Sequence, residues 1–188
     1  MAVQAGADAL GFVFFEKSPR YLSPERAAVI IAGIPPFVQV VGLFVNEPLD
    51  LVNATADRCG LDIVQLHGEE SPSYCASVRR RVLKAFRVQG MQSLATMADY
   101  RVAGYLLDAY SPNSYGGTGE QFDWDCAVAA KGRGPIVLAG GLNPDNVAAA
   151  VLRVAPCAVD VSSGVESSPG RKDPVKVRDF VRYAKNPL

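Results

Sequence analysis

The first candidate for chemistry in this sequence is a single acid at the end of an apolar run. The run from Tyr105 ends on Asp108, and a loop with three glycines, at positions 116, 117 and 119, follows almost at once. Burial disfavours a charged carboxylate, and a neutral carboxylic acid can donate a proton. The pattern therefore predicts a general acid, with a capping or ion-paired aspartate as the alternative. The loop is either a mobile cover over a ligand or a plain long turn.

Two loops of small residues near the end of the chain have the composition of a phosphate site. Gly140-Gly141 follows one apolar run, and Ser162-Ser163-Gly164 follows the next. Small residues let backbone N–H groups approach an anion closely, and a helix N-terminus adds a favourable dipole. The pair of loops predicts phosphate binding, whereas two ordinary tight turns are the alternative.

Three other polar side chains lie in or beside apolar runs. Asp160 shares a face with Ser162, so an inward acid there must be paired or functional. Arg20 offers a bidentate fork for a carboxylate, unless it is a surface arginine. His67, the only histidine, closes another run and is predicted to contact substrate, although a structural role is the commoner one for a lone histidine.

Seven short apolar runs must form the elements that position these residues. They are continuous rather than alternating, which is typical of parallel strands covered on both faces. The runs are Ala9–Phe14, Val38–Val45, Ile63–Leu66, Val82–Val88, Tyr105–Leu107, Ile136–Ala139 and Ala158–Val161.

Helix starts separate the runs, because a capping residue precedes a proline between several of them. These starts are Ser23-Pro24, Ser71-Pro72, Asn143-Pro144 and Asp173-Pro174, with Asn46-Glu47-Pro48 as a looser version. Alternating strands and helices predict an α/β fold with a parallel sheet, either an open doubly wound sheet or a (β/α)₈ (TIM) barrel. No G-x-G-x-x-G follows the first strand, which weakens the dinucleotide-binding alternative.

The composition excludes several classes of protein. The formal net charge is zero and half of the residues are hydrophobic, which argues against a disordered chain and against nucleic acid as a partner. Residues 27–45 carry no charge, but Gly33, Pro35 and Pro36 interrupt them, so we expect no membrane span. The four cysteines lack metal-site spacing, and no signal peptide is visible. We expect a cytoplasmic monomer.

Six stretches distributed over the whole chain are similar to phosphoribosylanthranilate isomerases, the tryptophan-pathway family with a (β/α)₈ barrel. The stretches are GADALGFVFFEKSPRYLSPE, VGLFVNEP, VQLHGEESPSYC, LLDAYSPNSYGGTGEQFDW, LAGGLNPDNV and VDVSSGVESSPGRKDP. The combination is specific to this family, although each stretch alone is not. The bifunctional histidine/tryptophan isomerase on the same barrel is a less similar alternative.

The resemblance implies an Amadori rearrangement of N-(5-phosphoribosyl)anthranilate, with no metal and no organic cofactor. It assigns Asp108 as the general acid and Arg20 as the contact to the anthranilate end. Asp160 takes a supporting role at the rim, and His67 contacts substrate. The phosphate-binding positions are Gly140, Gly141, Ser162, Ser163 and Gly164.

One departure from the family pattern concerns the general base, a cysteine in a short K-[IV]-C-G stretch at the end of the first strand. This sequence has no such stretch, and its cysteines all lie within or beside predicted helices. We therefore expect residues 1–188 to form one barrel domain that lacks strand 1 and most of helix 1. The chain as given is expected not to rescue a tryptophan auxotroph, whereas a form extended by the upstream codons should.

Two alternatives to an active isomerase follow from the same departure. One is a catalytically impaired relative that only binds a sugar phosphate. The other is a fragment that a partner strand completes.

Overall fold

The computed structural model describes residues 1–109 and 122–188, so the glycine loop at positions 116–119 lies outside the described residues. In the described part, seven parallel strands form one sheet in the order in which they occur along the chain. They are β1 (Ala9–Val13), β2 (Gln39–Phe44), β3 (Ile63–Leu66), β4 (Arg81–Val88), β5 (Gly104–Ala109), β6 (Ile136–Leu138) and β7 (Ala158–Val159). All seven predicted strands are confirmed.

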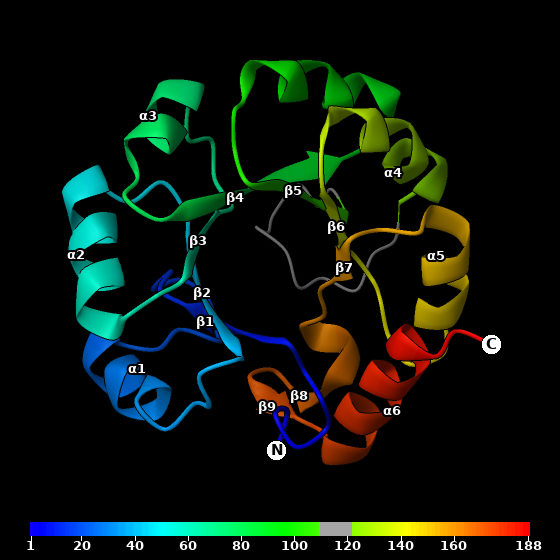
Figure 1. Ribbon diagram of the computed structural model, residues 1–188, viewed down its shortest axis with the longest axis horizontal. Helices are drawn as coiled ribbons and strands as arrows, with labels where there is room; N and C mark the ends of the chain where they lie inside the picture. Colours follow the sequence, from blue (N-terminus) through cyan, green and yellow to red (C-terminus); the bar gives the residue numbers. More distant parts are fainter. Residues whose placement is uncertain (110–121) are drawn as a thin grey trace.

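The sheet curls around a central axis, and the helices lie outside it (Figure 1). They are α1 (Pro24–Ile31), α2 (Leu49–Cys59), α3 (Pro72–Ser77), α4 (Trp124–Ala130), α5 (Val147–Val154) and α6 (Pro174–Lys185), with the 3₁₀ segments η1 (Met91–Asp99), η2 (Lys131–Arg133) and η3 (Ser163–Val165). A strand order that follows the chain, with helices outside, is the arrangement of a barrel and not of a doubly wound sheet. In this sheet β1 and β7 are the two edge strands.

Three of the predicted helix starts are confirmed by their hydrogen bonds. The side chains of Ser23, Ser71 and Asp173 accept backbone N–H groups of the first helical turn, and a proline follows each cap. Each cap satisfies a backbone donor that the helix itself leaves unpaired.

The predicted start at Asn143-Pro144 is wrong, because α5 begins at Val147. The side chain of Asn143 accepts the N–H of Asp145, and the resulting turn delays the helix. The looser cap at Asn46 is also wrong, since Pro48 is the N-cap of α2 and Asn46 has a left-handed φ of 53°. Residues 2–6 form hydrogen-bonded turns before β1.

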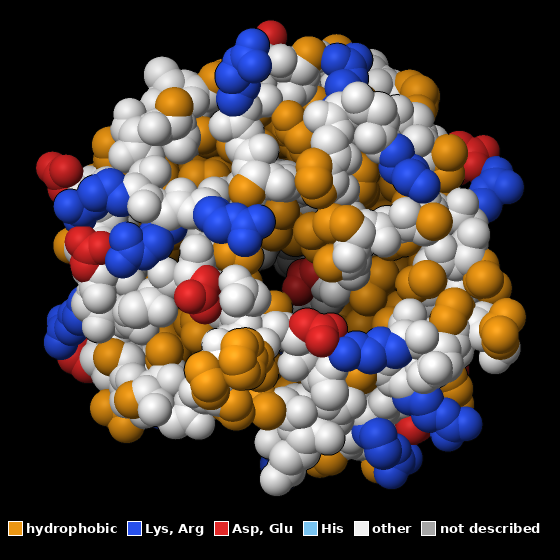
Figure 2. Space-filling view, viewed as in Figure 1, with side chains coloured by type: hydrophobic (Ala, Val, Ile, Leu, Met, Phe, Trp, Pro, Cys, Tyr) orange, Lys and Arg blue, Asp and Glu red, His pale blue; other side chains and the backbone are white. Residues whose placement is uncertain are grey.

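Two hydrophobic clusters fill the layer between strands and helices, and a third, small cluster lies among the inward-facing residues. The third contains Ala85, Leu106 and Ala139. These small and medium side chains fill the barrel axis below the polar residues that end the same strands. Figure 2 shows one end of the molecule, with charged side chains around the periphery and a central hollow that contains an acidic side chain.

The chain continues past β7 into η3 and a short hairpin of β8 (Glu166–Ser168) and β9 (Arg171–Lys172). Within the described ranges, no helix has the length and apolar character needed to cross a membrane.

Candidate active site

Asp108 and His67 face each other inside the curled sheet. Side chains alternate along a strand, so Asp108 of β5 shares its face with the interior residue Leu106. The His67 Nε2 atom lies 3.2 Å from Asp108 Oδ2, and the N–H of Ala109 donates to Asp108 Oδ1 at 2.9 Å. His67 is 5% exposed and Asp108 6%, so both groups are shielded from water. A shielded carboxyl with a neighbouring imidazole has the chemistry of an acid–base pair.

The first small-residue loop touches this acid directly. Gly140 has a left-handed φ of 79°, and a β-carbon added there would lie 2.5 Å from the backbone nitrogen of Ala109 and 3.2 Å from Asp108 Oδ1. Only glycine allows this approach together with this backbone conformation. Gly141 follows with a φ of 64°. The loop after β6 therefore begins against the acid.

The second small-residue loop packs against the first. A β-carbon added at Gly164 would lie 1.9 Å from the carbonyl oxygen of Leu142, so the two backbones are in contact. Ser162, Ser163 and Gly164 are all partly exposed. The structure thus brings the two small-residue loops together, with Gly140 of the first loop against Asp108.

Asp160 lies just after β7 and not within it, because β7 ends at Val159. This corrects the predicted strand end, although the backbone N–H of Asp160 still donates to Leu138 of β6 at 2.8 Å. Asp160 is exposed at the sheet edge, yet the surrounding protein desolvates its carboxyl and raises its pKa, and the negative charge of Asp108 acts in the same direction. Two neighbouring carboxyls that disfavour double ionisation are typical of acid–base sites.

Arg20 does form a bidentate ion pair, but with a residue of the protein itself. Its Nε and Nη2 atoms donate to the two carboxylate oxygens of Glu166 at 2.9 Å and 2.7 Å. Lys172 donates to Glu166 at 2.9 Å and to the carbonyl oxygen of Ser162 at 2.8 Å. The Arg20–Glu166–Lys172 cluster carries one net positive charge beside the second small-residue loop, which suits an anionic ligand.

The carboxylate of Glu166 should make stability depend on pH. Burial opposes its ionisation, but the hydrogen bonds from Arg20 and Lys172 outweigh burial and lower its pKa to about 2. A carboxylate whose pKa is lowered by folding stabilises the fold at pH values above its unfolded-state pKa, for which the unperturbed value is 4.5. This stabilisation is lost as the pH falls from there towards 2. We expect Glu166→Gln to lower the free energy of unfolding at neutral pH by about 2–3 kcal/mol, and the difference to shrink below about pH 4.

Urea unfolding at a series of pH values measures this effect. Glu25→Gln is the control, because Glu25 forms a largely exposed ion pair with Arg58 and should change the pH dependence much less. An unfolding free energy for Glu166→Gln that stays parallel to that of the unsubstituted protein across the pH range would contradict the expectation.

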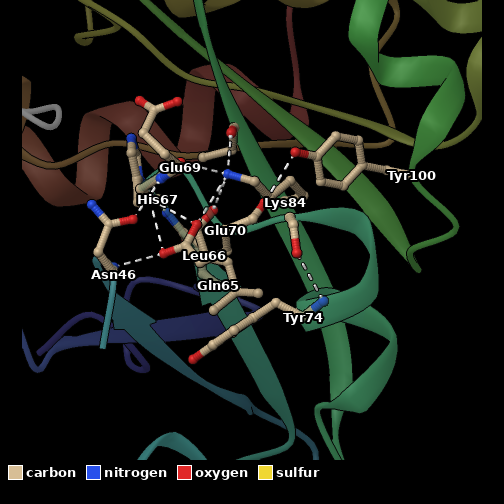
Figure 3. A network of polar contacts seen from close by, with 12 residues as sticks. Asn46, Gln65, Leu66, His67, Glu69, Glu70, Tyr74, Lys84 and Tyr100 are labelled. Atoms are coloured by element: carbon tan, nitrogen blue, oxygen red, sulfur yellow. Dashed lines mark hydrogen bonds and ion pairs between the residues drawn. The ribbon is translucent and has the colours of Figure 1, made fainter. Parts of the chain in front are cut away.

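A second polar network lies behind His67, on the outer side of the sheet (Figure 3). Glu70 Oε1 accepts the backbone N–H groups of Asn46 at 2.8 Å and Gly68 at 3.1 Å. Its other oxygen lies 3.1 Å from Lys84 Nζ, which also donates to the carbonyl oxygens of Leu66, Gly68 and Ala85. This network fixes the turn that begins directly after His67.

Sequence reasoning missed Gln65, Glu70, Lys84 and Glu166. One signal was available, because Lys84 interrupts an otherwise apolar strand and a buried lysine requires a partner.

None of the four cysteines belongs to this site. Cys59, Cys75 and Cys126 are buried in the outer helices α2, α3 and α4, and Cys157 is exposed just before β7 begins. Desolvation by the surrounding protein, which for the exposed Cys157 is only partial, raises the pKa of each thiol. A raised pKa lowers the thiolate fraction and with it the reactivity of these side chains.

Comparisons of the sequence and of the fold with known proteins both match the same family of isomerases. A family model described as N-(5'-phosphoribosyl)anthranilate (PRA) isomerase matches residues 1–183. The N-(5'-phosphoribosyl)anthranilate isomerase of Citrifermentans bemidjiense is 76% identical over 185 residues, which are 98% of this chain and 90% of that protein. The corresponding protein of Geobacter sulfurreducens is 64% identical, over 98% of this chain and 91% of its own.

Solved structures superpose closely on the described fold. The crystal structure of phosphoribosyl anthranilate isomerase from Thermotoga maritima matches with a TM-score of 0.92 and 44% identity, over 98% of this chain and 91% of that one. A phosphoribosyl anthranilate isomerase in complex with reduced 1-(o-carboxyphenylamino)-1-deoxyribulose 5-phosphate matches with a TM-score of 0.89 and 43% identity, over 98% and 90% of the two chains. The predicted barrel fold class and the family resemblance are confirmed.

Proposed function

The chain belongs to the N-(5'-phosphoribosyl)anthranilate isomerase family, and we propose that Asp108 is the proton donor with which it opens the sugar ring of its substrate. The reaction converts N-(5-phosphoribosyl)anthranilate into 1-(2-carboxyphenylamino)-1-deoxyribulose 5-phosphate, a step of L-tryptophan biosynthesis. The observation that carries the assignment of Asp108 is its place between His67 and Gly140, shielded from water and against the first small-residue loop.

The proposed first step transfers the proton of Asp108 to the ring oxygen. The bond between C1 and the ring oxygen breaks, the nitrogen lone pair forms the C1=N bond, and Asp108 becomes a carboxylate. Loss of the C2 proton to a base then gives the enol, which rearranges to the ketone. We assign the base to none of the four cysteines, since three are buried in outer helices and Cys157 precedes β7 at the opposite end of that strand from Asp160.

The two small-residue loops hold the substrate phosphate in this proposal. Gly140 and Gly141 give close access to backbone N–H groups, and Ser162, Ser163 and Gly164 continue the same surface. The Arg20–Glu166–Lys172 cluster lies beside the second loop, where its net positive charge attracts the doubly anionic end of the substrate and leaves further N–H groups of Arg20 for the anthranilate carboxylate.

Titration with inorganic phosphate and with the reduced product analogue, followed by amide NMR, tests the phosphate site. We expect the backbone N–H signals of Gly141, Ser163 and Gly164 to shift with both ligands. The amides of Gly60 and Gly132 are the controls, because Gly60 caps the C-terminus of α2 and Gly132 lies in η2, outside both loops. Unchanged signals in both loops at saturating analogue would overturn the assignment.

A second candidate function is binding of a sugar phosphate without turnover. The position of the four cysteines favours it, since none faces Asp108 as a base. Analogue binding together with no consumption of substrate would identify this candidate, whereas turnover excludes it.

A further inference from the structure

Gln65 is a buried polar residue that the reaction described above does not use. It lies two positions before His67 on β3, which places both side chains on the same inner face of the sheet. Its exposed fraction is 6%, and its Nε2 atom lies 2.9 Å from Nδ1 of His67 (Figure 3). An amide nitrogen can only donate a hydrogen bond, so Nδ1 must accept. The neutral imidazole then carries its proton on Nε2.

The Nε2 atom of His67 points to Asp108. It is fully buried and has no well-aligned hydrogen bond within the described part of the chain, although Asp108 Oδ2 is only 3.2 Å away. A buried N–H donor without an acceptor is unfavourable, and a carboxylate is a stronger acceptor than a neutral carboxylic acid. The donor therefore gains most when Asp108 has lost its proton.

We propose that Gln65 is a positioning residue, which holds His67 in the Nε2–H tautomer so that the imidazole donates to Asp108 as its carboxylate forms. The inference rests on the proposed role of Asp108 as the general acid. Asp108 gives its proton to the ring oxygen, and neither His67 nor Gln65 gains or loses a proton. A hydrogen bond that strengthens only as charge develops lowers the barrier and not the energy of substrate binding.

The surrounding structure fixes the backbone of His67, so the Gln65 variants change the contact of the ring and not the position of the chain. The backbone N–H of His67 donates to Phe44 of β2 at 2.9 Å. Gly68, the next residue, donates to both oxygens of Glu70 at 3.1 Å and 3.0 Å. Removing the Gln65 amide therefore leaves the backbone of His67 in place.

Because His67 is the only histidine, ¹⁵N NMR of the imidazole reports its tautomer without assignment ambiguity. The variants are Gln65→Met, of similar shape without the amide, and Gln65→Glu, whose carboxylate accepts a hydrogen bond from an Nδ1–H group. Gln39→Met is the matched control, because it replaces the same amide by the same side chain at an exposed position on β2. The same substitutions, made in the form extended by the upstream codons, are assayed for kcat and KM.

The unsubstituted protein and Gln39→Met should show the proton on Nε2. Gln65→Met should show both tautomers, with kcat lower by about tenfold, and Gln65→Glu should show the proton on Nδ1, with kcat lower by about 10²-fold, the magnitude typical of one lost donor to a developing anion. KM should change little in either variant. A merely structural role would alter neither the tautomer nor the split between kcat and KM.

A proton on Nδ1 in the unsubstituted protein would overturn the proposal, and so would a kcat for Gln65→Glu within twofold of normal. Failure of the proposed function has a different signature. In that case Asp108→Asn keeps its turnover, while the imidazole spectra of the Gln65 variants still decide whether Gln65 sets the tautomer.

Discussion

In the form extended by the upstream codons, Asp108→Asn is expected to lower kcat by about 10²–10⁴-fold, the contribution that a positioned general acid makes. Asparagine has nearly the same shape, and its amide oxygen can still accept the N–H of Ala109, as Asp108 Oδ1 does at 2.9 Å. What it lacks is an acidic proton for the ring oxygen. The fold and the neighbouring loops should therefore persist while the chemical step fails.

Binding should separate the loss of chemistry from the loss of the site. The reduced product analogue should bind Asp108→Asn within a few-fold of the unsubstituted enzyme, because Gly140, Gly141 and the second small-residue loop are unchanged. Asp125→Asn is the control. Asp125 lies on α4 and forms an exposed ion pair with Arg153 of α5. Turnover by Asp108→Asn within tenfold of normal would mean that another group donates the proton.

The sequence predicted the strands well because their signal is local. A continuous apolar run buried on both faces needs no distant partner to be recognised, and β5 is buried at all six positions. The same reasoning located Asp108, since an acid that ends such a run must reach the rim of the sheet. The error at Asn143-Pro144 has a local cause too, because a capping residue before a proline also fits the turn that Asn143 forms.

The residues that the sequence did not reveal owe their roles to partners distant along the chain. Arg20 and Glu166 are 146 positions apart, and nothing near either residue indicates that they pair. Gln65 matters only because strand alternation places it beside His67 and the sheet places His67 opposite Asp108. The register of the strands creates these contacts, and register is set by the whole fold and not by the local sequence.

Lys84→Met is expected to lower the free energy of unfolding by about 3–5 kcal/mol, because it leaves the buried carboxylate of Glu70 without its cation. The side chains of Lys84 and Glu70 are only 3% and 2% exposed, and their charged atoms lie 3.1 Å apart. The lysine also donates to the carbonyl oxygens of Leu66, Gly68 and Ala85 at 3.3, 2.7 and 3.1 Å, so three acceptors lose their partner. The loss is a large share of the 5–15 kcal/mol that stabilises a typical domain.

The double variant Lys84→Met/Glu70→Gln should recover part of this loss, since removing both charges leaves neither one buried alone. Urea unfolding of the two single variants and the double variant gives the coupling between the residues. Lys185→Met is the matched control, because Lys185 forms an exposed ion pair with Asp8 and should cost at most about 1 kcal/mol. If Lys84→Met were no less stable than Lys185→Met, the pair would not hold the turn after His67, and the fixed His67 backbone on which the Gln65 variants depend would need another support.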